Sequence, residues 1–184
     1  MNVLAYYADR MESIAVDGKD AESVLVLRRG KSESATVIGD GKIIVTENST
    51  AIANGDLVTR SDGQRYFIVA KQYSADCTQM QGKRVNATVQ LVELTDVYVN
   101  HKKTGVIPTV LASDVPVHYT DISASMKLYD AGLLPKTVKR ILLRSPLKLL
   151  NRIVLNGRNY QVDNIDTAKY VGLYEVQVSE DTRV

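Results

Sequence analysis

The sequence predicts an all-β protein of two related small antiparallel β-barrel-like halves, with long inter-strand loops and a short N-terminal helix. The first observation is a pair of segments, Asp56–Val69 and Asn151–Val162, that follow one pattern. Each runs from apolar alternation into Asp-Gly or Asn-Gly, then a polar pair, a tyrosine and renewed alternation. These dipeptides are the strongest short-range hairpin signal, because a type I′ turn needs positive φ at both central residues.

The second observation is that the elements around the two hairpins match in the same order. Each half reads as strand, long loop, strand, loop, hairpin, loop and strand, and five short strands separated by turns favour a small barrel. A tandem repeat is the favoured interpretation, and one continuous β-sandwich is the alternative. The matched strands are Ser23–Arg29 with Asp114–Thr120, Lys42–Val45 with Arg140–Leu143, and Ala87–Leu94 with Leu173–Val178.

The repeat divides the chain into four segments. Residues 1–18 form an N-terminal arm or short helix, 19–99 the first barrel half, 100–111 a polar linker, and 112–184 the second half. Helical spacing of four side chains favours the short helix, which Asp17-Gly18 would end. The alternative is an arm that docks on a neighbouring subunit. The four side chains are Tyr6, Tyr7, Met11 and Ile14.

A long insertion separates the first two strands of each half. Residues 30–41 are polar and rich in glycine, which predicts an exposed loop. Residues 121–137 contain apolar side chains that must be buried somewhere. A short helix covering one mouth of the barrel is one account, and docking into an adjoining protein is the other. The candidates for this loop contact are Met126, Leu128, Leu133 and Leu134.

Composition argues against several classes of protein. The 184 residues include 23 basic and 21 acidic ones, and a net charge of +2 does not mark a general nucleic-acid or membrane binder. The single cysteine, Cys77, excludes an intrachain disulfide and lies in a polar stretch that predicts an inert thiol. No apolar run approaches the roughly 18 residues that span a bilayer, and the N-terminus does not resemble a signal peptide. We expect synthesis in the cytoplasm and no membrane partner.

The sequence contains no recognisable catalytic constellation. Its two histidines are His101, in the predicted linker, and His118, which is opposite in phase to Val115 and Val117 and so should face outward. Neither has a second histidine at metal-binding spacing. The nucleophile elbow, the P-loop and the dinucleotide-binding glycine motif are also missing from the sequence. We therefore expect no enzymatic activity, no metal and no cofactor.

One stretch, from Ala131 to Val162, has basic residues but no acidic ones. Pro146 would break a basic amphipathic helix there, so the charge should lie along one end of the second half. One interpretation is a solvated face balanced by acids elsewhere, such as Asp163, Asp166, Glu180 and Asp181. The other is a basic rim that contacts an acidic partner surface or a nucleic-acid backbone. The candidate contacts are Lys136, Lys139, Arg140, Arg144, Lys148 and Arg152, and Arg158 completes the run.

The paired hairpins resemble those of tailed-bacteriophage neck proteins of the head-closure or head–tail adaptor type. These proteins often carry a Gly-Asp strand, a glycine turn and a Tyr-x-Val strand, seen here in Gly55–Val69 and again in Arg152–Val162. Val24–Arg29 looks like their first strand, and Gly172–Asp181 looks like their last. The chain departs from the usual single-barrel stopper by being doubled.

The resemblance implies a virion structural protein in the neck, between portal and tail. Copies would form a homo-oligomeric ring that contacts portal or adaptor and tail proteins, with non-specific DNA contact in its lumen. The basic residues could face that lumen, and residues 121–137 could reach a neighbouring ring. The alternatives are a nucleic-acid-binding small-barrel module and a structural protein of the tail or baseplate.

Overall fold

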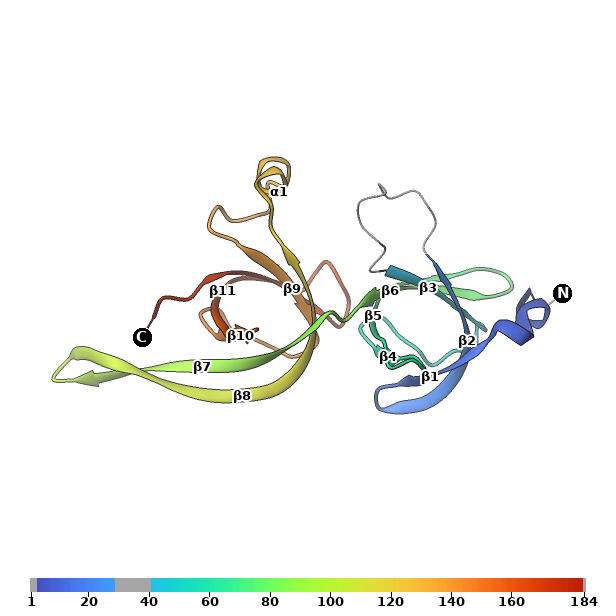
Figure 1. The fold of residues 1–184 in the computed structure, drawn as a ribbon, viewed down its shortest axis with the longest axis horizontal. Coiled ribbons are helices and arrows are strands. Elements are labelled where there is room, and N and C mark those ends of the chain that lie inside the picture. Colours follow the sequence, from blue (N-terminus) through green and yellow to red (C-terminus); the bar gives the residue numbers. More distant parts are fainter. Residues whose placement is uncertain (1–2, 29–40, 184) are drawn as a thin grey trace. The chain divides into compact units, whose positions relative to one another are not determined.

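The computed structural model describes residues 3–28 and 41–183 of the chain (Figure 1). They form two compact units, the first comprising Met1–Val85 with Tyr170–Gly172 and the second Asn86–Lys169 with Leu173–Val184. Each unit contains a closed antiparallel barrel of six strands. The predicted all-β fold with two barrel-like halves is confirmed.

The first barrel has the strand order β1-β2-β3-β6-β5-β4 and closes where β1 pairs with β4. A 3-10 helix, η1 (Val3–Arg10), precedes it and packs Leu4 against Leu25, Val45 and Cys77 on the outside of the barrel. The strands are β1 (Glu12–Val16), β2 (Lys19–Arg28), β3 (Gly41–Thr46), β4 (Leu57–Thr59), β5 (Arg65–Tyr73) and β6 (Thr78–Arg84).

The second barrel has the order β7-β8-β9-β12-β11-β10 and closes where β7 pairs with β10. This is the connectivity of the first barrel with every strand moved on by six, so the two units are copies of one topology. Its elements are β7 (Ala87–Val99), β8 (Lys102–Asp121), α1 (Ala124–Tyr129), β9 (Lys139–Leu143), β10 (Arg152–Leu155), β11 (Arg158–Asp166) and β12 (Tyr174–Glu180).

Matching tyrosines lie in the two cores. Tyr66 and Tyr160 each come three residues after the turn glycine of their hairpin, and both are buried inside their barrels. The hydroxyl of Tyr66 donates a hydrogen bond of 2.6 Å to Oε1 of Gln64. A tyrosine suits this position because its ring fills the barrel end while its hydroxyl reaches a polar partner. The Gly-turn-Tyr pattern therefore marks equivalent positions in both copies.

The same polar contact is found just before the first strand of each hairpin. In the first unit, Oδ2 of Asp56 accepts a hydrogen bond of 2.8 Å from the N–H of Ala53. In the second unit, Oδ1 of Asn151 accepts one of 2.7 Å from the N–H of Lys148, at the same spacing of three residues. Both side chains are buried. Each satisfies a backbone donor that the loop would otherwise leave unpaired.

Two predictions about the strands are corrected. Each barrel has six strands rather than five, and Ala87–Leu94 belongs to β7, the first strand of the second barrel, instead of closing the first half. The last strand of the first barrel is β6, which matches β12. At the N-terminus, the helix ends at Arg10, and Ile14 lies in β1. Gly18, with φ of 75°, turns the chain from β1 into β2.

The predicted linker is also wrong. Residues 100–111 contain the turn and part of the second strand of the β7–β8 hairpin, and the units change between Val85 and Asn86. The N–H of Val85 donates to the carbonyl of Arg65 in the first unit (2.8 Å). Asn86 is held in the second unit, because its side chain both donates to and accepts from the backbone of Tyr119.

The second hairpin turn is as predicted, but the first is different. Asn156 and Gly157 have φ of 51° and 74° between the paired ends of β10 and β11, as a type I′ turn requires. In the first hairpin the loop covers residues 60–64, and φ is positive at Gly63 (79°) but not at Asp62. An Asp-Gly dipeptide is compatible with both geometries, because longer hairpin loops also place glycine at the left-handed position.

Of the two predicted insertions, residues 30–40 lie outside the described part of the chain, and Gly41 begins β3. In residues 121–137, the short helix α1 is present, with Ser123 as its N-cap: the hydroxyl of Ser123 accepts from the N–H of Met126. The helix contains no buried residue, so contacts beyond α1 must hold this segment in place.

Candidate interaction surfaces

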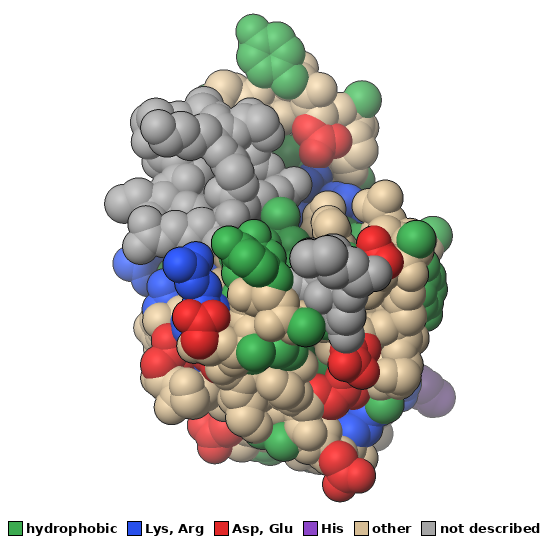
Figure 2. All heavy atoms as spheres, turned by 90° about the vertical axis from the view of Figure 1, so that its right-hand side faces the viewer, with side chains coloured by type: hydrophobic (Ala, Val, Ile, Leu, Met, Phe, Trp, Pro, Cys, Tyr) green, Lys and Arg blue, Asp and Glu red, His purple; other side chains and the backbone are tan. Residues whose placement is uncertain are grey.

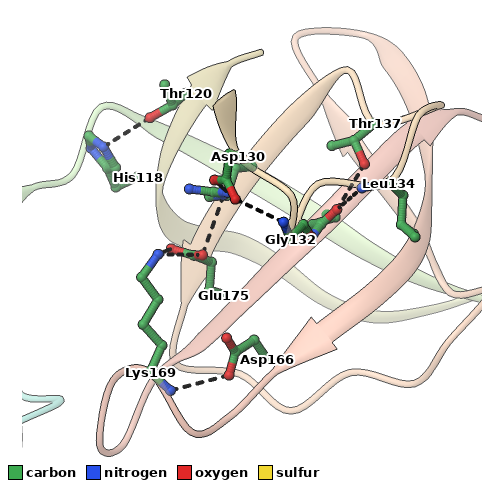
Figure 3. A network of polar contacts seen from close by, with 11 residues as sticks. His118, Thr120, Asp130, Gly132, Leu134, Thr137, Asp166, Lys169 and Glu175 are labelled. Carbon is green, nitrogen blue, oxygen red and sulfur yellow. Dashed lines mark hydrogen bonds and ion pairs between the residues drawn. The ribbon is translucent and has the colours of Figure 1, made fainter. Parts of the chain in front are cut away.

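The chain between α1 and β9 lies over the outer face of β12, where Gln177 holds it (Figure 3). Oε1 of Gln177 accepts hydrogen bonds from the N–H of Leu134 (2.9 Å) and the hydroxyl of Thr137 (3.0 Å). Its amide donates to the carbonyl of Gly132 (2.7 Å). The neighbours of Gln177 along β12 point into the core, so this side chain points out of the barrel and satisfies the loop that covers it.

Arg140, on β9, adds a charged contact beside Gln177. Its Nη2 donates to Oδ2 of Asp130 (2.6 Å), and its Nε lies 3.4 Å from Oε1 of Glu175. Lys169 donates to both oxygens of Glu175 (2.8 and 3.0 Å). The hydrogen bond from Arg140, together with one from the N–H of Gly132, lowers the pKa of Asp130. The segment after α1 is thus held at its start by the ion pair between Arg140 and Asp130, and further along by the hydrogen bonds of Gln177.

The four predicted loop contacts differ in how far their side chains are exposed. Met126, Leu133 and Leu134 are half-buried, whereas Leu128 is 78% exposed. Tyr129 is exposed beside it. Leu128 and Tyr129 therefore form the part of α1 that is open to a partner.

The predicted basic contacts are mostly neutralised within the second unit. Five of the six form ion pairs there, and Arg144 is not free of interactions either. This distribution favours the interpretation of basic residues balanced by acids, and Asp163 and Asp181 are two of the acids expected. The pairs are Lys136 with Asp163, Lys139 with Asp121, Arg140 with Asp130 and Glu175, Lys148 with Glu93, and Arg152 with Asp181.

The last of these pairs is structural. The side chain of Asp181 is fully buried and accepts hydrogen bonds from Nε of Arg152 (2.8 Å) and from Nε and Nη2 of Arg183 (both 2.8 Å). Burial alone would raise the pKa of Asp181, but the hydrogen bonds from Arg183 and Arg152 outweigh it and hold the pKa well below its usual range. Arg152 therefore stabilises the end of the second barrel and is a poor candidate for a partner contact.

His118 follows the predicted alternation but not the predicted exposure. Its neighbour Val117 lies in the core and Tyr119 packs against the core, so the imidazole points out of the barrel. It is nevertheless only 5% exposed, and one ring nitrogen lies 3.4 Å from the hydroxyl of Thr120 (Figure 3). A sequence pattern specifies the face of a strand, but it does not show which outer faces are covered by other residues.

The β7–β8 hairpin carries several exposed apolar side chains of the second unit. Residues 93–99 of β7 pair with residues 102–109 of β8 well beyond the barrel, and Figure 1 shows this arm reaching away from the other strands. Tyr98 is 61% exposed and Ile107 is 57% exposed. Val99, Val110 and Leu111 are also exposed. An isolated two-stranded ribbon is at best marginally stable in water, so these side chains are suited to be covered.

The β8 edge of this hairpin is partly protected against further strand pairing. β8 pairs with β9 over His118–Asp121, and within the described residues no second strand pairs with residues 102–117. Pro108 and Pro116 lie in that stretch. Proline has no N–H to donate and commonly blunts an open sheet edge. The arm is therefore suited to binding through its faces and tip.

Sequence reasoning missed the arm because Lys102, Lys103 and Gly105 look like a polar linker. The signal was nevertheless present: alternating apolar residues end at Val99 and resume at Val106, around a two-residue turn. The turn residues Asn100 and His101 have φ of 50° and 61°, the geometry of a type I′ turn. Asparagine tolerates this conformation better than most residues, so Asn100 was the residue that indicated a hairpin turn here.

Within residues 3–28 and 41–183, no cluster of three or more His, Cys, Asp or Glu side chains could hold a metal ion. No helix in this part of the chain is long and apolar enough to cross a membrane. The sequence matches no known protein-family model and no curated protein.

Proposed function

We propose that this chain is a structural protein of a tailed-bacteriophage virion, part of the head-closure or head–tail adaptor assembly between portal and tail. The observation that carries the proposal is the β7–β8 arm, which presents apolar side chains beyond a closed barrel. A protein that joins others needs a rigid body and surfaces that neighbours can cover. The two barrels supply the body, and the arm and the tip of α1 supply the surfaces.

The closed barrels suit such a body because they have no open edges. Strand addition, which could lead to uncontrolled association, is limited to open stretches of strand such as the β8 edge of the arm, where Pro108 removes one backbone donor. Contacts between copies, or with portal, adaptor and tail proteins, would then be made by side chains of the arm and by Leu128 and Tyr129 of α1. The resemblance of both hairpins to those of neck proteins supports this role.

The alternative of a nucleic-acid-binding module receives less support. Its basic residues would have to contact phosphates, but most of them already pair with carboxylates of the same unit. Breaking those pairs would reduce the free energy gained from each phosphate contact. Of the five that form ion pairs, Lys136 and Lys148 are the most exposed and best placed to touch DNA in a lumen.

The proposal is tested on virions from the strain that encodes the chain. Particles are purified on a density gradient, and the protein is detected by mass spectrometry and located by immunogold labelling. We expect it in tailed particles in several copies, with label at the junction of head and tail. Label at the distal end of the tail would indicate a tail or baseplate protein instead. Absence from particles, with the protein present in the lysate, would refute a virion role.

A further inference from the structure

The tip of the β7–β8 arm is basic as well as exposed. Lys102 and Lys103 follow directly after the turn, at the end of the arm farthest from the barrel. Nζ of Lys103 lies 2.6 Å from Oδ1 of Asp96, and this pairing with Lys103 lowers the pKa of Asp96. Lys102 forms no ion pair with any residue that the structure describes. The tip therefore presents one uncompensated positive charge.

The first unit contains a pocket of opposite charge. It has a volume of about 450 Å³ and is lined by Met11, Ser23 and Thr46 together with two carboxylates, Glu22 and Glu47. In the view of Figure 2, acidic side chains are spread more widely over the surface than basic ones.

Neither carboxylate of the pocket is neutralised by a cation of the described chain. Glu22 accepts hydrogen bonds from the hydroxyl of Thr50 (2.5 Å) and the N–H of Ala51 (2.8 Å), which fix it in place without cancelling its charge. Glu47 accepts a longer one, of 3.4 Å, from the hydroxyl of Ser49. A cationic group entering the pocket would thus meet two carboxylates, one of them already oriented.

We propose that the tip of the β7–β8 arm of one copy binds this pocket on the first unit of a second copy. The inference rests on the proposed function and names the partner of the arm. Lys102 would approach Glu47 and Glu22, while Tyr98 and Val99 would pack near Met11. Because the arm and the pocket belong to different units, the contact is head-to-tail. Repetition of such a contact builds a ring where the rotation closes.

The test uses two proteins of different tag length, both carrying Cys77→Ala. One has Lys102→Cys and the other has Glu47→Cys, and the mixture is oxidised and separated under non-reducing conditions. We expect a disulfide-linked heterodimer that is more abundant than either homodimer. The matched control replaces Glu47→Cys by Asp76→Cys, an exposed acidic position of the same barrel. Equal crosslinking of the two partners would overturn the inference.

A charge exchange provides a second measurement, by analytical ultracentrifugation. Lys102→Glu should weaken self-association about tenfold, and combining it with Glu47→Lys should restore it. Association that is unchanged by both variants, or absent in the wild-type protein, would overturn the contact. These outcomes are independent of the virion test. A chain found in virions without the crosslink would refute this contact alone, and a crosslink without virion incorporation would refute the neck role.

Discussion

Gly55 and Leu150 occupy the same position in the two barrels, one residue before the buried Asp56 and Asn151. Both have positive φ, 86° at Gly55 and 68° at Leu150. The N–H of Gly55 donates to the carbonyl of Ile68 (2.8 Å), and that of Leu150 donates to the carbonyl of Val162 (2.9 Å). The shared turn therefore imposes a left-handed residue on both copies, but the second copy places leucine where glycine would be unstrained.

Leu150→Gly should stabilise the second unit. A leucine in the left-handed region costs roughly 1–2 kcal/mol, and glycine removes this strain. Only part of that free energy is regained, because glycine also gives the unfolded chain more conformational entropy. Since the side chain of Leu150 is exposed, little buried surface is lost. We expect a gain of about 0.5–1 kcal/mol in the free energy of unfolding, measured by urea titration. Leu149→Gly, at the exposed neighbour, is the control and should give no gain.

Gln177→Leu should loosen the segment that covers β12. The substitution keeps the size of the side chain but removes three hydrogen bonds, to Gly132, Leu134 and Thr137. At roughly 1 kcal/mol each, the loss is about 2–3 kcal/mol. Hydrogen exchange should show faster exchange of the Leu134 amide, with the core of the barrel still protected. Ser179→Ala, two residues along the same strand, should leave that amide protected; equal protection in Gln177→Leu would contradict the role of Gln177.

The local features of the fold were the ones that the sequence predicted well. The hairpins at Asp62-Gly63 and Asn156-Gly157 were found because turn geometry depends on a few neighbouring residues. The residue-by-residue alignment of equivalent strands in the two halves was predicted less well. Lys42–Val45 and Arg140–Leu143 are equivalent strands, but Ile44 points into its barrel, whereas Ile141 and Leu143 point into theirs. A shift of one residue exchanges the faces of a strand, and two short apolar runs do not specify that shift.

Features that depend on distant residues could not be predicted. β6 was missed because Met80 is its one large apolar residue, and its inward positions Thr78 and Gly82 resemble a loop. The anchoring role of Gln177 was missed because its partners lie forty or more positions away. Of the candidate contacts, Leu128 is open to a partner. Arg152 is not, because its buried partner Asp181 could not be assigned from the sequence.

Asp181 should make the stability of the second unit depend on pH in the acid range. Its pKa is lowered in the folded state, so its contribution is complete above the unfolded carboxyl value of about 3.9 and is lost as pH falls through the folded pKa. Asp181→Asn should cost about 2–3 kcal/mol at neutral pH and flatten the acid dependence of unfolding. Thermal unfolding from pH 7 downward measures both effects. In Glu180→Gln, an exposed neighbour, the wild-type dependence should persist.

Binding to DNA should be weak, because the ion pairs of the second unit leave few basic residues free. Each phosphate neutralised contributes about −0.9 to the slope of log affinity against log salt concentration. Lys136 and Lys148 are the most exposed of the paired cations, so we expect a slope no steeper than about −2 in fluorescence anisotropy with duplex DNA. Replacing both by alanine should make the slope shallower, whereas Arg140→Ala should lower stability. A much steeper slope that falls in Arg140→Ala without loss of stability would favour the nucleic-acid-binding alternative over the structural one.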